Sequence, residues 1–296
     1  MILYFNTPKD NITFCRKCIE AKDIISKIKN STTIWRHQFA PTNIIGKMSE
    51  LYKELNPINV VDFYQKYINS ENGKNQEYLE RLAFDYKCQV NDKENIPLEL
   101  YFYDAVCHII YETYNGMERE KQISNYLKKN TWINDVQTVN NDIDKNYGID
   151  RLLITKKGTF GLQIKPITFF ISTYEKRPDT YFDRFGSVVK YFKTKRDKNI
   201  TTLFAIYEEI KGETYTKYKW FAKDNKILFH IEDLFDNISA IEEDFDTFLK
   251  IYEPTKDKNS KEKHTISKEE IIKIQESMKD LKVSIRDKYK LVDLPL

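Results

Sequence analysis

Apolar residues recur at helical spacing through the first 115 residues of the chain. Polar, proline or glycine signals bound the segments with this spacing, which are residues 44–55, 60–68, 76–86 and 97–115. The last of these is expected to end at Asn115-Gly116, and a further helix at 117–129 to begin after it. The pattern predicts a helical N-terminal region over residues 1–115.

The pattern changes to that of strands beyond the Asn- and Asp-rich segment 140–147. A tight turn is expected at Lys156-Lys157-Gly158, between a strand at 149–155 and a return strand at 159–170. The other expected elements are a helix at 181–192, a buried strand at 201–207 and short strands at 220–222 and 227–231. This order predicts an α/β domain over residues 116–253, with a mixed central β-sheet flanked by helices.

Charged residues dominate the segment that follows this domain. Residues 254–266 contain almost no apolar side chains, so they are expected to form a linker. Ser267 can cap an amphipathic helix, which is expected to make up the C-terminal part, residues 267–296.

Composition allows a sizeable core but does not by itself identify a partner. Hydrophobic residues make up 41% of the 296 residues, enough for one large domain or two modest ones. The net charge is only +3, but lysine and arginine outnumber the acids over residues 175–198, whereas residues 232–246 are acidic. The basic stretch is either a local nucleic-acid-binding face or a solvated helix surface.

The N-terminal residues do not resemble a signal peptide, and no apolar run is long enough to span a membrane. The protein is therefore expected to be cytoplasmic, with its four cysteines as free thiols or metal ligands. Cys15 and Cys18 have the spacing of a metal-ligand pair, but the chain lacks a matching second pair. Two reduced thiols on a helix are the alternative. His108, among apolar neighbours, is interpreted as a core histidine rather than a catalytic base.

Three polar residues of the expected hairpin can meet on one face. Asp150 begins the first strand, and Gln163 and Lys165 lie two residues apart on the return strand. Residues two apart on a strand point to the same side, so the three side chains can converge while Ile164 faces a core.

An acid, an amide oxygen and a lysine together suit phosphodiester hydrolysis. Asp150 and the carbonyl of Gln163 are hard oxygen ligands for Mg²⁺, which activates water and neutralises phosphate charge. Lys165 can hold the attacking water and offset charge in the transition state. Glu120, on an otherwise apolar helix face, is expected to support the metal or its water.

These residues resemble the motif set of the PD-(D/E)xK nucleases, which include type II restriction endonucleases. The resemblance is carried by Gly116-Met-Glu-Arg-Glu120, Gly148-Ile-Asp150 and Gln163-Ile-Lys165. It implies a restriction-endonuclease-like fold, with Glu120, Asp150, Gln163 and Lys165 as catalytic residues and the first three as metal ligands.

Two departures from the family pattern affect the site. Ile149 stands where the family has proline before the aspartate, and Gln163 stands at the second acidic position. Gln163 cannot carry charge, so the site has one anionic metal ligand fewer. The substitution leaves open a descendant that binds DNA without cleaving it.

A finer resemblance is to restriction endonucleases of the MjaI type, carried by IWRHQFAPTNIIGKMSELYKEL, YGIDRLL and LQIKPI. It implies Mg²⁺-dependent double-strand cleavage of DNA at a short palindrome by a homodimer, leaving 5′-phosphate and 3′-hydroxyl ends. A cognate DNA methyltransferase would be a system partner without direct contact. The alternatives are a structure-specific repair nuclease or resolvase and a catalytically inactive DNA-binding module.

The expected DNA contacts lie in three parts of the chain. Arg36, His37 and Gln38 combine donors that suit base edges or phosphates, and the N-terminal region is the expected recognition or dimer part. The remaining candidates are Arg151 beside Asp150 and the basic residues Arg184, Lys190 and Lys193 after the hairpin.

Overall fold

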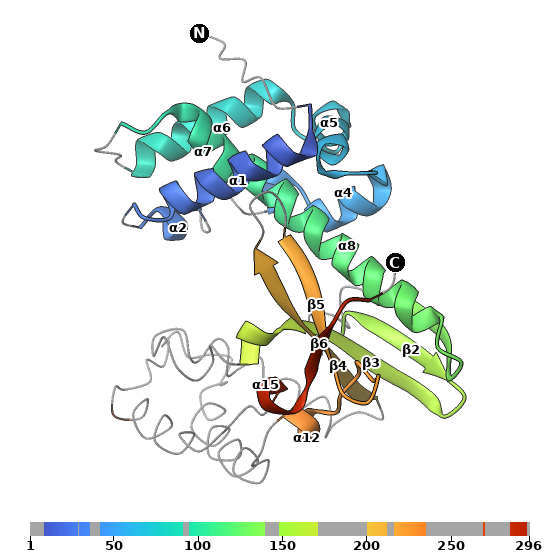
Figure 1. The fold of residues 1–296 in the computed structure, drawn as a ribbon. Helices are drawn as coiled ribbons and strands as arrows, with labels where there is room; N and C mark the ends of the chain where they lie inside the picture. The colour runs from blue at the N-terminus through green and yellow to red at the C-terminus, as the bar shows by residue number, and fades with distance from the viewer. Residues whose placement is uncertain are drawn as a thin grey trace. The chain divides into compact units, whose positions relative to one another are not determined.

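The computed structural model describes residues 9–28, 30–35, 42–90, 95–139, 148–170, 200–211, 216–234, 269 and 285–294 (Figure 1). The chain divides into two compact units, Met1–Gln122 with Lys211–Lys217 and Ile123–Ile210 with Tyr218–Leu296. The division falls inside a helix, between Gln122 and Ile123, and not at the expected boundary after residue 115.

Helices make up the described part of the first unit apart from its Lys211–Lys217 segment, as the hydrophobic spacing predicted. They are α1 (Asn11–Ile25), α2 (Ser31–Ile34), α3 (Thr42–Ile45), α4 (Met48–Leu55), α5 (Val60–Asn69), α6 (Gln76–Val90) and α7 (Leu98–Phe102). From α7 the chain passes through a π-helix, η2 (Tyr103–Cys107), into α8 (His108–Lys128). The expected helical N-terminal region is confirmed.

Short polar side chains define several of these helix ends. Asp10 caps α1 by accepting a hydrogen bond from the backbone N–H of Thr13 at 2.8 Å. Asn59 caps α5 in the same way, accepting from Asp62 N at 2.8 Å. Asn56 ends α4 in the left-handed conformation, φ 42°, immediately before a proline.

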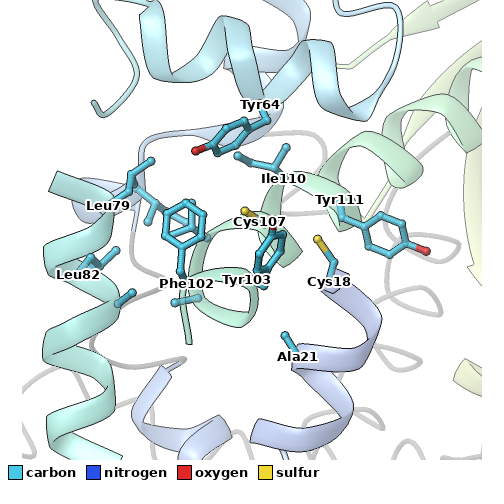
Figure 2. Packing of buried hydrophobic residues seen from close by; sticks show 14 of the residues in the cluster. Cys18, Ala21, Tyr64, Leu79, Leu82, Phe102, Tyr103, Cys107, Ile110 and Tyr111 are labelled. Carbon is cyan, nitrogen blue, oxygen red and sulfur yellow. The ribbon is translucent and has the colours of Figure 1, made fainter. Parts of the chain in front are cut away.

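Aromatic residues of α7 and η2 form the centre of the helical core. Figure 2 shows Phe102, Tyr103 and Cys107 lying between the helices that contribute Tyr64 and Cys18. The rings of Tyr64 and Phe102 meet edge to face with their centroids 6.4 Å apart. Each such side chain stabilises the fold by about 1.5–3 kcal/mol through removal from water, so this unit has a core of its own.

Helix α8 runs without a break through Asn115 and Gly116, where the sequence was expected to end a helix. That prediction is wrong. Gly116 keeps a helical conformation, and the residues on either side of it, such as Tyr111 and Ile123, are held by burial. Glycine costs a helix only about 1 kcal/mol relative to alanine, less than the packing of the flanking turns supplies.

The second unit contains a six-stranded sheet. Its strands, in spatial and chain order, are β1 (Ile133–Thr138), β2 (Arg151–Thr155), β3 (Gly158–Pro166), β4 (Thr201–Lys211), β5 (Thr216–Ala222) and β6 (Lys290–Val292). Strands β1–β2, β2–β3 and β5–β6 pair antiparallel, whereas β3 and β4 pair parallel. The expected mixed sheet is confirmed.

Both faces of this sheet are packed. On one face Ile123 and Leu127 of α8 join a buried cluster with Leu162 and Ile164 of β3. On the other, Phe204 of β4 contacts the ring of Phe170 at 5.9 Å. Two short helices, α12 (Ile231–Leu234) and α15 (Ile285–Lys288), add further buried residues. The fold is therefore α/β, with helices flanking a mixed sheet.

Several expected boundaries differ in the structure. The return strand ends at Pro166, which has no N–H to continue the ladder, and residues 167–170 are helical rather than extended. Within 227–231 only Phe229 forms a bridge, to Phe204.

The expected C-terminal helix is wrong over Lys290–Val292, which form strand β6 against β5. The expected helix at 181–192 and the linker at 254–266 lie outside the described residues. In the described part of the chain, no helix has both the length and the apolar character needed to cross a membrane.

Candidate active site

A tight turn aligns the two strands that carry the expected site. Thr155 Oγ1 accepts from Lys157 N at 3.1 Å and donates to the carbonyl of Gly158 at 2.9 Å. Gly158 has φ 128°, a conformation that side chains rarely adopt. The turn sets the register in which Arg151 pairs with Leu162, so Asp150 falls beside Gln163.

Asp150 is held against the return strand by three hydrogen bonds. Its backbone N–H donates to the carbonyl of Leu162 at 2.8 Å. Its Oδ2 atom accepts from Gln163 Nε2 and from the backbone N–H of Ile164, both at 2.7 Å. The structure thus brings Asp150 and Gln163 together and fixes the carboxylate through main-chain and side-chain donors.

The other end of the Gln163 amide has no hydrogen-bond partner. Gln163 is 0% exposed, and its Oε1 atom is buried and unpaired. Leaving such an acceptor unsatisfied costs about 1–3 kcal/mol. A half-turn of the amide would exchange Oε1 and Nε2 and place an oxygen beside the Asp150 carboxylate.

This pair of oxygen donors fits a hard divalent cation. Carboxylate and amide oxygens are the ligands that Mg²⁺ takes, and Mg²⁺ keeps several waters in its shell. Among the residues that the structure describes, no group of three His, Cys, Asp or Glu side chains could hold a metal. Asp150 and Gln163 would therefore form a partial shell rather than a closed protein cage.

Lys165 lies on the same face of β3 as Gln163, two residues along, and is half-buried. Its ammonium group lies 5.4 Å from the ring centroid of Phe169. The ring attracts the cation electrostatically but carries no charge that could neutralise it. Ile164, between the two polar residues, is buried in the core on the opposite face.

Glu120 occupies a half-buried position on α8 and belongs to the first unit. Its participation with Asp150 therefore stays a prediction. Its neighbour Glu118 accepts a hydrogen bond from Tyr52 and pairs with Lys121 at 3.5 Å. Burial, with that hydrogen bond, raises the pKa of Tyr52, so its hydroxyl remains a donor at neutral pH.

Of the expected DNA contacts, the structure describes Arg151 alone. Arg151 pairs with Leu162, so its side chain starts from the sheet face opposite to Gln163. Its guanidinium donates to the backbone carbonyl of Asp150 at 2.8 Å, which steadies the start of β2. The others, Arg36, His37, Gln38, Arg184, Lys190 and Lys193, lie outside the described residues.

Sequence reasoning missed two contacts that hold the site residues. The backbone N–H of Ile164 binds the carboxylate of Asp150, and no side-chain pattern reports such a donor. Phe169 lies under Lys165, and the aromatic pair four residues after the lysine was the available signal.

Within the described residues, neither the cysteine pair nor His108 belongs to a second metal site. Cys15 and Cys18 are buried free thiols, and burial raises the pKa of Cys15 to about 11. Burial also lowers the pKa of His108 to about 4, so this histidine is neutral at physiological pH. Cys15 and Cys18 are therefore protonated thiols of the helical core, which agrees with the interpretation of two reduced thiols on a helix.

The mixed sheet and its flanking helices define an α/β protein of the restriction-endonuclease-like class. The model of the family described as MjaI restriction endonuclease matches residues 26–283, which include most of the helical unit and strands β1–β5. The chain belongs to this family. No curated protein and no solved structure matches it.

Proposed function

We propose that the protein is a type II restriction endonuclease. It would cut both strands of DNA at a specific sequence and hydrolyse phosphodiesters to 5′-phosphate and 3′-hydroxyl ends. Membership of a restriction endonuclease family supports nuclease activity. The observation that carries the proposal is the hairpin on which Asp150 touches Gln163, while Lys165 shares the face of Gln163.

Asp150 and Gln163 are the residues that would hold Mg²⁺. When bound, the ion would lower the pKa of a water and neutralise charge on the phosphate. The unpaired Oε1 of Gln163 supports this assignment, because a buried oxygen without a donor is ready to accept a cation.

The chain's own groups then have separate tasks. Two backbone groups hold Asp150 in place before substrate arrives: Ile164 N donates to the carboxylate, and Leu162 O accepts from the Asp150 N–H. Lys165 would hold the attacking water and offset the charge that develops on the phosphate. Glu120 would support the ion or its water from α8.

The proposed partner is double-stranded DNA. Arg36, His37, Gln38 and the helical region over residues 1–115 would serve recognition or dimerisation. Trp35, just before this basic segment, donates through Nε1 to Ala105 O at 3.4 Å and lies under Lys22. A palindromic target would be read by a homodimer with one site per strand. A methyltransferase would protect the same sequence without touching the nuclease.

One observation favours a second candidate, a DNA-binding module that does not cleave. The amide of Gln163 already satisfies Asp150 at 2.7 Å, so this carboxylate is stable without a cation. Family membership favours restriction over structure-specific repair or resolvase activity.

The decisive experiment is digestion of a sequenced plasmid with Mg²⁺, followed by sequencing of the fragment ends. Discrete fragments with 5′-phosphate ends are expected. Lys165→Ala should lower the cleavage rate by roughly 10²-fold or more, because it removes charge stabilisation in the transition state. Binding of the same DNA in Ca²⁺ should change by only a few-fold.

Lys156→Ala is the matched control, because Lys156 is exposed at the turn of the same hairpin. It should cut at the wild-type rate. Sequence-specific binding without any product in Mg²⁺ or Mn²⁺ would identify the inactive module. Cleavage of branched DNA alone would identify a repair nuclease.

A further inference from the structure

We propose that Ile149, whose side chain packs against the backbone of Gly161, is the positioning residue that holds Asp150 over Gln163. The inference rests on the proposed function of this site. It concerns two apolar residues that take no part in the chemistry themselves.

The chain reaches Asp150 through a bend that crosses the face of β3. Gly148 has φ 65°, a left-handed conformation, and Asp150 itself lies in a bend before β2 begins. Ile149, between them, is 1% exposed. The segment is therefore pressed against the return strand rather than projecting from it.

Gly161 provides the space that Ile149 occupies. A methyl group at position 161 would lie 2.8 Å from Ile149 Cδ1, 3.0 Å from Ile149 Cγ1 and 3.2 Å from Thr202 Oγ1. Carbon atoms in contact are normally about 3.5–4.0 Å apart. Gly161 does not have a left-handed backbone, so here glycine is required for room and not for conformation.

The contact bears directly on the carboxylate. Ile149 is joined by one peptide bond to Asp150, whose N–H reaches Leu162 O at 2.8 Å. The carboxylate then accepts from Ile164 N and Gln163 Nε2. These three hydrogen bonds all reach residues 162–164 of β3, which directly follow Gly161 in the strand.

Ile149 has little room to move away from an added methyl group. It is 1% exposed, and its β-branched side chain has few alternative χ1 rotamers. The added methyl would therefore lift residues 149–150 away from β3 and lengthen the bonds to Asp150. Where related nucleases have proline before the aspartate, this chain restrains the same position by packing.

Four proteins test this inference: wild type, Gly161→Ala, Ile149→Val and the double variant. Valine lacks Cδ1, the atom nearest to the added methyl. Gly161→Ala should lower kcat by about ten- to a hundred-fold, since misplacing a catalytic group by about 1 Å has that effect. Ile149→Val retains Cγ1, which also lies near position 161, and should lower kcat by no more than a few-fold. The double variant should regain most of the activity that Gly161→Ala loses. DNA binding in Ca²⁺ should be the same in all four.

The matched control is Gly161→Ala with Ile154→Val. It adds the same methyl group at position 161 and removes a methyl group from another isoleucine, Ile154, which is not among the residues nearest to position 161. It should not restore activity. Amide hydrogen exchange over residues 148–164 gives a second readout: Gly161→Ala should raise exchange there, and Ile149→Val should reverse the rise.

The outcomes separate this inference from the proposed function. If Gly161→Ala cuts like wild type, or the double variant stays as slow as the single one while folded, the positioning role is wrong and the nuclease stands. If wild type cuts nothing, the proposed function fails, and hydrogen exchange alone decides the packing role. Unchanged exchange in Gly161→Ala would then overturn it.

Discussion

The chemistry of the hairpin depends at the residue scale on how the Gln163 amide is used. Its nitrogen donates to Asp150, and its oxygen is buried without a partner. A glutamine at this position therefore stabilises the cation-free state, which a second carboxylate would not. We expect the metal affinity of this site to be lower than that of a site with two acids, because one ligand is neutral.

Gln163→Glu should make folding depend on the metal. It replaces a donor 2.7 Å from Asp150 Oδ2 with a second buried carboxylate. Without a cation the two acids repel, and the free energy of unfolding should fall by roughly 2–4 kcal/mol. Mg²⁺ should restore most of this loss. Thermal unfolding in EDTA and in Mg²⁺ measures both effects.

The chain offers a matched control for this change. Gln137 donates to Asp135 at 3.0 Å in a similar but exposed pair on β1. Gln137→Glu should change the unfolding temperature little, with or without Mg²⁺, because water screens the charges. Equal losses at the two positions in EDTA would contradict the burial argument.

At the scale of elements, local sequence patterns were sufficient to predict the structure where residues that are close in sequence also lie close in space. The hairpin could be predicted because its alternation and its turn lie within one short segment, and Asp150 and Gln163 met as expected. The bend that places Ile149 over Gly161 could not, because no local pattern reports a side chain that packs against the backbone of a glycine. Strand β6 was missed for a different reason, since its partner β5 is distant in sequence.

The uninterrupted helix α8 shows the opposite error. Asn115-Gly116 is a strong local stop signal, but burial of the flanking turns overrides it. Helix propensity alone therefore predicts that a helix ends at Gly116, whereas packing of the flanking turns continues it. The prediction fails here because the free energy gained by tertiary packing exceeds the local free-energy cost of keeping Gly116 in a helix.

Gly116→Ala should stabilise the protein. The position is helical, and a methyl group there would meet only the guanidinium of Arg119, at 3.7 Å. Alanine loses less backbone entropy on folding, so the free energy of unfolding should rise by about 0.5–1 kcal/mol. Urea denaturation checks this. A lower stability would show that α8 needs a flexible point at Gly116.

At the scale of the whole molecule, the helical unit buries two ionisable groups with opposite responses to acid. Burial lowers the pKa of His108 to about 4 from its usual 6.5. Burial raises the pKa of Asp104, against the opposing effect of Lys22 at 3.5 Å. His108 therefore binds a proton less readily in the folded protein than in the unfolded chain, whereas Asp104 binds one more readily in the folded protein.

His108→Phe should make the protein more tolerant of acid. Between pH 6.5 and about 4 the unfolded chain binds a proton at His108 that the folded chain does not, so wild-type stability falls as pH falls. The variant lacks this loss, which reaches roughly 3 kcal/mol at the lower pH. Asp104 is present in both proteins, so the difference between them isolates His108.

Denaturant titrations of both proteins at several pH values measure this difference. It should be constant above pH 7 and grow as the solution is acidified. A difference that does not depend on pH would mean that His108 has the same pKa in the folded protein as in the unfolded chain, which would contradict the effect of burial.

The parallel pairing of β3 with β4 has a consequence for how the chain folds as it is synthesised. No tight turn can join parallel neighbours, and residues 167–200 separate these two strands. The hairpin leaves the ribosome complete while β4 has yet to be translated, so we expect β2 and β3 to pair first. Until β4 docks, the open edge of β3 is a template for other chains, so we expect aggregation of incomplete chains to begin at this edge.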